Sequence, residues 1–187
     1  MDRENGILTY TNTLFYPLSP QMDEVKIEDI AHALSQMCRA NGHFKSFYSV
    51  AQHSIHCAEE AKARGLSGKM QLVCLLHDAS EAYISDITRP VKCYLEEYRK
   101  IEEKLQSVIY EKFGICNLTK EECRQLQEID NALLHHEFKC LHYRGIYEDS
   151  PKLYRCHDFT EKNMVDIEKR FIQLAQSIVR NQLSENS

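Results

Sequence analysis

Apolar residues recur at helical spacing along most of this chain, and this periodicity constrains the fold more than any other feature of the sequence. Apolar residues three, four and seven positions apart line one face of a helix. The pattern runs through residues 27–39 and 94–109, and it returns over about 160–182. Glycines follow the first two segments as stops, at Gly42 and Gly114. These segments predict three helices separated by turns.

Capping residues indicate two further helices. Ser49 precedes a run that ends at Gly65, and serine is a favoured N-cap because its hydroxyl accepts a backbone hydrogen bond. Residues 119–122 are Thr-Lys-Glu-Glu, which is the pattern of a capping box. We expect the helix that they open to extend to about His142.

Little of the sequence departs from this helical pattern. The first twenty residues alternate aromatic and polar side chains, which predicts an extended segment or one small hairpin. Glycine (6 residues) and proline (4 residues) are too scarce for many long loops. We therefore predict an all-α fold, a helical bundle with a short irregular or hairpin N-terminal segment. The length suits one domain over residues 1–187.

Charge and hydropathy limit the classes of partner. A net charge of -5 and a pI near 6.0 argue against binding a nucleic acid polymer, whereas a small anionic ligand is compatible with both. No apolar run approaches the ~20 residues of a membrane span, and the first residues lack a signal-peptide pattern. We expect a cytoplasmic protein that does not enter a membrane.

The eight cysteines need a separate interpretation. Most lie 16 to 23 residues apart and no C-x-x-C occurs, so zinc-ribbon and thioredoxin-type sites lack their spacing. We expect most of them to be reduced thiols that pack as small apolar side chains.

An imidazole and two carboxylates follow the most apolar segment of the chain. Residues 70–76 are apolar on nearly all sides, which predicts a buried helix with His77 and Asp78 near its end. Buried ionisable groups without partners are costly, and a metal ion would remove that cost. Imidazole with carboxylate suits a divalent Mn, Co, Fe, Ni or Zn ion. Glu81, one turn further, could then handle the proton of a water on that ion.

Four segments resemble the HD-domain phosphohydrolases: residues 49–54, 77–81, 86–92 and 129–132. The resemblance covers roughly residues 26–142 and is closest to the bacterial 5′-deoxynucleotidases and their viral deoxynucleotide triphosphohydrolase relatives. It implies an HD-domain helical bundle in which Glu81 acts in proton transfer. It also implies four metal ligands: His53, His77, Asp78 and Asp130.

The same resemblance implies contacts to a substrate. Asp86 and Lys92 match residues that reach the sugar and the phosphate, and Arg39 is the candidate for a phosphate-binding arginine before the first histidine ligand. Lys92 and its neighbour Arg89 could also be ordinary loop charges. The deoxynucleotidases commonly follow that arginine with a tryptophan that closes against the sugar. Here Ala40 follows and the chain has no tryptophan, so the sugar preference stays open.

Several histidines and acids have simpler interpretations. His56 lies close to His53 on the same predicted helix and is a second candidate ligand. Asp130 could be a solvated acid of an amphipathic helix. His135 and His136 lie five and six residues beyond Asp130, so we expect them to face elsewhere and to be structural or surface residues.

The leading hypothesis is a metal-dependent phosphohydrolase of small nucleotides. We expect it to act on (deoxy)nucleoside 5′-monophosphates with a metal-activated water as nucleophile. Two alternatives stay open: a dNTP triphosphohydrolase, or a non-catalytic helical scaffold or adaptor that the metal stabilises. We also expect a homodimer or higher homo-oligomer, because the C-terminal apolar stripe and three nearby tyrosines offer apolar surface, at Tyr143, Tyr147 and Tyr154.

Overall fold

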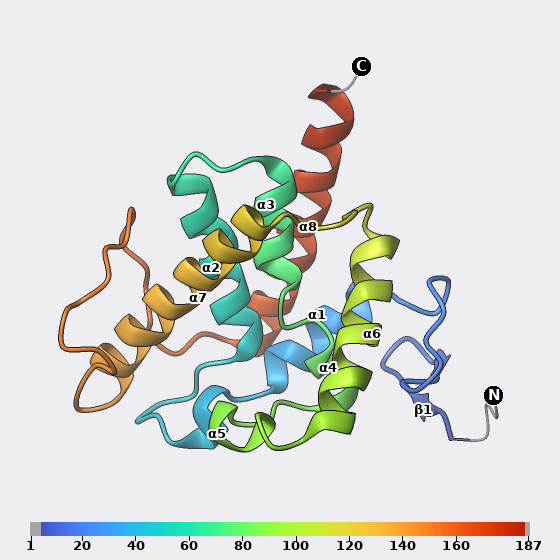
Figure 1. The fold of residues 1–187 in the computed structure, drawn as a ribbon, viewed down its shortest axis with the longest axis horizontal. Helices are drawn as coiled ribbons and strands as arrows, with labels where there is room; N and C mark the ends of the chain where they lie inside the picture. Colours follow the sequence, from blue (N-terminus) through green and yellow to red (C-terminus); the bar gives the residue numbers. More distant parts are fainter. Residues whose placement is uncertain (1–4, 186–187) are drawn as a thin grey trace.

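The structure of the protein, a computed structural model, describes residues 5–185 and confirms the predicted all-α fold with a short N-terminal hairpin (Figure 1). The hairpin consists of β1 (Ile7–Leu8) and β2 (Leu14–Phe15), which pair antiparallel. The helical elements follow in chain order: α1 (Ile27–Gln36), the 3-10 turn η1 (Arg39–Gly42), α2 (Val50–Ala63), α3 (Gly68–Leu76), α4 (Glu81–Ile84), α5 (Arg89–Lys92), α6 (Glu96–Lys112), α7 (Lys120–Leu141) and α8 (Met164–Glu185).

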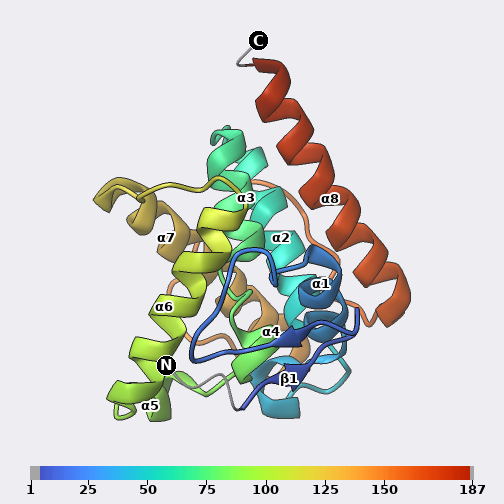
Figure 2. The ribbon, with the colours of Figure 1, turned by 90° about the vertical axis from the view of Figure 1, so that its right-hand side faces the viewer.

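The N-terminal hairpin packs against the bundle near α1 and α4 (Figure 2). The buried carboxylate of Asp29, on α1, accepts hydrogen bonds from the backbone N–H of Thr11 (2.7 Å) and from Oγ1 of Thr9 (2.9 Å). Phe15 is fully buried and stacks on Tyr83 of α4. These contacts satisfy a buried charge and fix the hairpin to the helices.

Helix α2 lies inside the bundle, in contact with α1, α3, α7 and α8 (Figures 1 and 2). Ser49 caps it as predicted, because its hydroxyl accepts the N–H of Gln52 at 3.1 Å. Most residues of α2 are buried, and so are those of the second half of α3. Polar side chains of α2 that face its neighbours are therefore enclosed by the fold.

The signals predicted for α6 and α7 are present. Thr119 and Glu122 form the capping box: the hydroxyl accepts the N–H of Glu122 at 3.2 Å, and the carboxylate accepts the N–H of Thr119 at 2.8 Å. Gly114 ends the turn after α6 with a φ of 71°, in the left-handed region that favours glycine. The short helix α5 was not predicted, because one turn that contains Pro90 is too short to show a helical periodicity.

Helix α1 ends before Arg39, which the periodicity had included. The following segment is extended because it pairs with the chain that leads into α2. The N–H of Arg39 donates to the carbonyl of Tyr48, and the N–H of Val50 donates to that of Met37, both at 2.9 Å. Ala40 then has a φ of 51°, a conformation that costs a non-glycine residue about 1–2 kcal/mol. Arg39 is thereby fixed as the first residue of η1, beside the start of α2.

Helix α3 ends just before His77, and a turn separates it from α4. The side chain of Gln106, on α6, bonds to both sides of this turn. Its amide donates to the carbonyl of Leu76 (2.7 Å), and its carbonyl oxygen accepts the N–H of Ser80 (3.1 Å). His77 and Asp78 therefore lie on a turn that α6 holds in place, at the end of the predicted buried helix.

Helix α8 begins later than its predicted start at Thr160, because Asn163 caps it by accepting the N–H of Val165 at 2.9 Å. Its apolar stripe packs inside the chain, where Phe171 is fully buried. The stripe is therefore used within the monomer. The predicted homo-oligomer rests instead on exposed tyrosines such as Tyr143, which is 84% exposed, and it stays a prediction.

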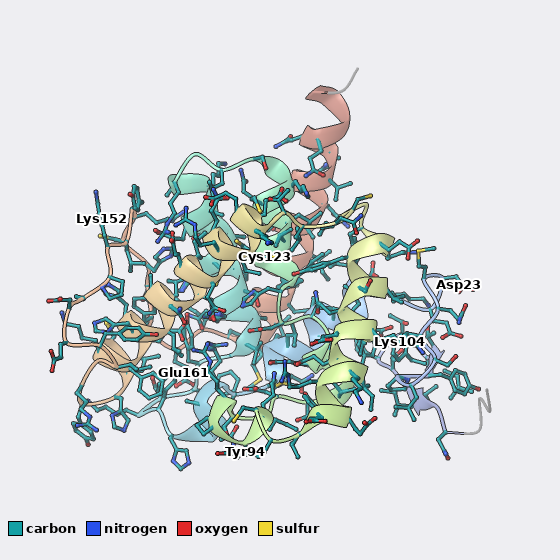
Figure 3. The ribbon with its side chains drawn as sticks, in the orientation of Figure 1. Asp23, Tyr94, Lys104, Cys123, Lys152 and Glu161 are labelled. Carbon is teal, nitrogen blue, oxygen red and sulfur yellow. The ribbon has the colours of Figure 1, made fainter. Side chains whose placement is uncertain are left out.

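Two further expectations have different outcomes. Within residues 5–185, every helix is too short or too polar to cross a lipid bilayer. All eight cysteines are free, as expected, but the expectation that most pack as small apolar side chains is wrong. Cys57 and Cys74 are buried, whereas five others are exposed, among them Cys123 on α7 (Figure 3).

Candidate metal centre

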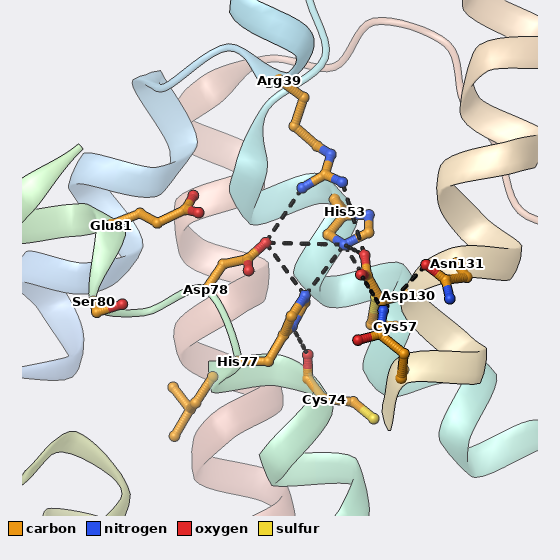
Figure 4. Close-up of polar contacts among 12 residues, drawn as sticks. Arg39, His53, Cys57, Cys74, His77, Asp78, Ser80, Glu81, Asp130 and Asn131 are labelled. Atoms are coloured by element: carbon orange, nitrogen blue, oxygen red, sulfur yellow. Dashed lines mark hydrogen bonds and ion pairs between the residues drawn. The ribbon is translucent and has the colours of Figure 1, made fainter. Parts of the chain in front are cut away.

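Side chains from three parts of the fold meet at one point inside the bundle (Figure 4). His53 comes from α2, His77 and Asp78 from the turn after α3, and Asp130 from α7. The Nε2 atom of His53 lies 3.3 Å from Nε2 of His77 and 3.3 Å from Oδ1 of Asp130. Oδ2 of Asp78 lies 3.2 Å from Nε2 of His77 and 4.0 Å from Nε2 of His53. The four residues implied as metal ligands therefore lie together.

Three of these four separations match those between neighbouring ligands of a single metal ion. Nitrogen and oxygen ligands lie about 2.0–2.2 Å from zinc, so neighbouring ligands are about 2.9 Å apart at a right angle and about 3.4 Å apart at a tetrahedral angle. The contacts of 3.2 and 3.3 Å fall in this range. The donor set and its spacing fit a divalent ion.

Hydrogen bonds on the far side of each imidazole fix which nitrogen faces the centre. Nδ1 of His53 lies 2.6 Å from the Glu137 carboxylate, and Nδ1 of His77 lies 2.8 Å from the carbonyl of Cys74. Both partners only accept, so each Nδ1 carries the proton and each Nε2 directs a lone pair at the centre. Two lone pairs 3.3 Å apart repel unless a cation lies between them.

The charges of the cluster also favour a cation. Burial and then the charge of Arg39 lower the pKa of His53. The charge of Glu137 and a hydrogen bond to Asp130 outweigh both, and the pKa of His53 lies well above its usual range. Burial raises the pKa of Asp130, but its hydrogen bond and attraction to His53 lower it well below the usual range. Without a metal ion, a proton on His53 takes the place of the cation.

Cys57 belongs to the cluster, although sequence reasoning missed it. It lies one turn after His53 on α2, and its Sγ is 3.3 Å from Nε2 of His53. Donor atoms of His53, Cys57 and His77 all lie within 4.8 Å of one another, so this group could hold a metal ion. The four-residue spacing from His53 on a buried helix is a signal in the sequence, but it does not form a C-x-x-C pair.

Glu137 is a second residue that sequence reasoning missed. It lies two turns after Asp130 on the same face of α7, and its side chain is fully buried. One oxygen accepts Nδ1–H of His53 at 2.6 Å, and the other accepts Nε–H of Arg39 at 3.2 Å. Burial raises the pKa of Glu137, but these two cationic neighbours lower it to about 2. This carboxylate therefore orients both an implied ligand and an implied phosphate-binding arginine.

Arg39 reaches the cluster from the first residue of η1, after the end of the helix in which it was expected. Its side chain is only 11% exposed. Nη1 lies 3.2 Å from Oδ2 of Asp78, and Nη2 lies 4.0 Å from Oδ1 of Asp130. Because Glu137 takes the Nε–H, the two Nη groups face the centre. Burial lowers the pKa of Arg39, but the surrounding carboxylates raise it above its ordinary value, so the guanidinium stays charged.

Glu81 lies beside the cluster at the start of α4, with its carboxylate directed toward Asp78 and Arg39 (Figure 4). The residue is 5% exposed, and its Oε2 atom is buried without a hydrogen-bond partner. Burial first, and then the charges of Asp78 and Asp86, raise its pKa well above the usual range. A carboxyl group in this position holds a proton more readily than an ordinary glutamate.

Lys92 lies beside Glu81, and the charge of Asp86 acts on the same carboxyl group. Nζ of Lys92 lies 3.8 Å from the Glu81 carboxylate and 2.6 Å from that of Glu102 on α6. Asp86 lies close enough for its charge to raise the pKa of Glu81. Arg89, for which an ordinary loop charge was one interpretation, also lies near the cluster. Its Nη2 is 3.3 Å from the Asp130 carboxylate, and its side chain is 64% exposed.

The other histidines weighed as ligands have different partners. Nδ1 of His56 lies 2.9 Å from the hydroxyl of Tyr48, and burial lowers the pKa of His56 to about 3. His56 lines a separate cavity of about 600 Å³ between α2, α8 and the segment before α8. Nδ1 of His135 accepts the N–H of Tyr147, and His136 bonds to a carbonyl. The structure therefore brings His53, not His56, into the cluster.

Replacing Glu137 by glutamine is expected to weaken metal binding about 10–100-fold, the usual effect of losing a group that orients a ligand. The amide keeps an acceptor for Nδ1 of His53 but removes the charge that pairs with Arg39. Competition of the purified variant with a metallochromic chelator gives the affinity. Glu128→Gln, on the exposed face of α7, is the matched control. Equal affinity in both variants would show that Glu137 does not position the centre.

Comparison with known proteins gives two relatives. No protein-family model matches the chain. The chain is similar to the uncharacterized protein YfdR of Escherichia coli (strain K12), at 40% identity over 109 residues, which are 58% of this chain and 58% of that protein. It is also similar to an uncharacterized protein of Rhodobacter capsulatus, at 36% identity over 104 residues, or 52% and 53% of the two chains. The chain thus spans little more than half the length of these curated relatives, whose names state no activity.

Proposed function

We propose that this protein is a metal-dependent phosphohydrolase of small nucleotides, of the HD-domain type, and that (deoxy)nucleoside 5′-monophosphates are its substrates. The observation that carries the proposal is the convergence of two imidazole nitrogens and two carboxylates on one point: His53, His77, Asp78 and Asp130. A charged Arg39 borders that point, and a buried carboxyl group, Glu81, lies beside it.

The donor set is that of a divalent Mn, Co, Fe, Ni or Zn ion. When bound, such an ion supplies a Lewis acid that lowers the pKa of a coordinated water toward neutrality. Hydrolysis then transfers the phosphoryl group to water and leaves the nucleoside with a free 5′-hydroxyl.

The residues around the ligands have separate parts in this reaction. Glu81, with its raised pKa, accepts the proton of the attacking water or passes a proton to the departing ester oxygen. The two Nη groups of Arg39 and the ammonium of Lys92 neutralise charge on the phosphoryl oxygens. We assign to Asp86, whose charge acts on Glu81, the acceptance of a hydrogen bond from a sugar hydroxyl.

The number of cations near the centre bears on the substrate. A monophosphate carries about two negative charges near neutral pH, which Arg39 and Lys92 can balance. A triphosphate carries more negative charge and needs more cationic side chains near the centre. One observation favours the dNTP triphosphohydrolase alternative: Arg89 adds an exposed guanidinium beside Asp130. We place the reaction in the cytoplasm, where free thiols such as those of this chain stay reduced.

A substrate panel tests the proposal. Metal-stripped protein is supplied with Mn, Co, Ni or Zn and then with dNMPs, NMPs and dNTPs, while phosphate, pyrophosphate and tripolyphosphate are measured. The proposal expects metal-dependent phosphate release from monophosphates. Release of tripolyphosphate from dNTPs would instead establish the dNTP triphosphohydrolase alternative. Metal binding without turnover of any nucleotide would favour the scaffold and contradict the proposal.

A further inference from the structure

The thiol of Cys57 lies at the candidate metal centre and not among ordinary core side chains. It is fully buried, and it comes from the same face of α2 as His53, one turn away. Cys74, on α3, is equally buried, but there the backbone carbonyl and not the thiol contacts His77. The two buried cysteines therefore offer a candidate ligand and a matched control.

The position of the Cys57 sulfur matches that of a ligand. Thiolate sulfur lies about 2.3 Å from zinc and imidazole nitrogen about 2.0–2.1 Å, so sulfur and nitrogen ligands are about 3.1 Å apart at a right angle and about 3.6 Å apart at a tetrahedral angle. The distance from Sγ of Cys57 to Nε2 of His53 is 3.3 Å, between these values. Nε2 of His77 lies within the same 4.8 Å cluster.

The hydrogen bonding of the thiol gives a second reason. The sulfur of Cys57 lies within hydrogen-bond distance of Nε2 of His53, and both side chains are fully buried. A metal ion bound at Nε2 occupies that nitrogen. The buried thiol then loses this hydrogen-bond partner unless the sulfur also binds the ion.

We propose that Cys57 is a thiolate ligand of the same ion as His53 and His77, which makes this a mixed nitrogen, oxygen and sulfur centre. Binding breaks the S–H bond, forms a metal–sulfur bond and releases the proton to solvent. Thiolate is a soft ligand, so the centre prefers zinc or cobalt(II) to manganese or magnesium. This inference rests on the proposed metal centre but concerns its composition and metal preference.

Cobalt(II) spectroscopy tests the ligand directly, because a thiolate–cobalt bond gives an intense charge-transfer absorption in the near ultraviolet. The probe is cobalt(II) alone, added to the metal-stripped full chain as wild type, Cys57→Ser and Cys74→Ser. We expect the band in the wild type and in Cys74→Ser, and its loss in Cys57→Ser. We also expect Cys57→Ser to lose more than about 100-fold in zinc affinity, beyond the usual effect of groups that only orient ligands.

The outcomes separate this inference from the proposed function. A wild type that binds cobalt(II) without the band overturns the thiolate ligand and leaves the phosphohydrolase proposal standing. A band that persists in Cys57→Ser assigns it to another cysteine and also overturns the inference. If the wild type shows the band but hydrolyses no nucleotide, the result supports Cys57 as a thiolate ligand and contradicts the proposed phosphohydrolase function. Cys57→Ala replaces the serine variant if that variant does not fold.

Discussion

Replacing His77 or Asp78 by alanine is expected to abolish metal retention and nucleotide hydrolysis together. Both side chains come from the turn after α3, and their donor atoms lie 3.2 Å apart at the centre. Each substitution therefore removes one donor atom from a small set of ligands. A site that loses such a donor loses most of its affinity for a borderline divalent ion. Elemental analysis of the purified variants and a phosphate-release assay measure the two effects.

His136→Ala is the control for these variants. His136 bonds to the carbonyl of Pro151, outside the cluster. Its loss should leave metal content and hydrolysis near wild-type values. Normal metal content in His77→Ala or Asp78→Ala would refute the assignment of that residue as a ligand.

Replacing Glu81 by glutamine is expected to lower kcat by roughly two to four orders of magnitude while metal content stays at the wild-type level. This is the usual contribution of general acid–base catalysis. The carboxyl group lies beside the ligands and not among them, and an amide cannot exchange a proton there. Burial disfavours the charged form of Glu81, so a neutral amide of the same shape should not destabilise the fold.

Steady-state kinetics with metal analysis tests Glu81. Glu97→Gln, at an exposed position of α6, is the matched control and should behave as the wild type. Loss of metal from Glu81→Gln would make Glu81 a ligand. Unchanged turnover would make it an incidental acid.

The parts of the fold that were predicted correctly depend on local signals. The caps at Ser49 and Thr119 and the stop at Gly114 act within one or two turns, so α2, α6 and α7 were recognisable in the sequence. The predicted limits of α1 and α8 were wrong where other contacts decide them. Residues 37–39 pair with the segment before α2, and Asn163 sets the start of α8.

The residues of the candidate site also divide into those that the sequence predicted and those that only the fold brings to the site. Its four implied ligands stand in motifs that the sequence displays, and the structure brings them together. Glu137 carries no motif, because its relation to His53 exists only once α7 packs against α2. Cys57 belongs to no motif either, although its spacing of one turn from His53 on α2 is visible in the sequence. The sequence offers for Arg89 only the interpretation of an ordinary loop charge, because the fold alone places it beside Asp130.

The central claim is that this cluster is a catalytic metal centre, and a titration of the metal-stripped protein tests it most directly. Bound metal and phosphate release from a deoxynucleoside 5′-monophosphate are measured on the same samples as the divalent ion is added. The account predicts that hydrolysis rises in proportion to bound metal, saturates at equimolar metal and disappears again with a chelator. Hydrolysis that does not depend on bound metal, or a chain that binds no divalent ion, would contradict it.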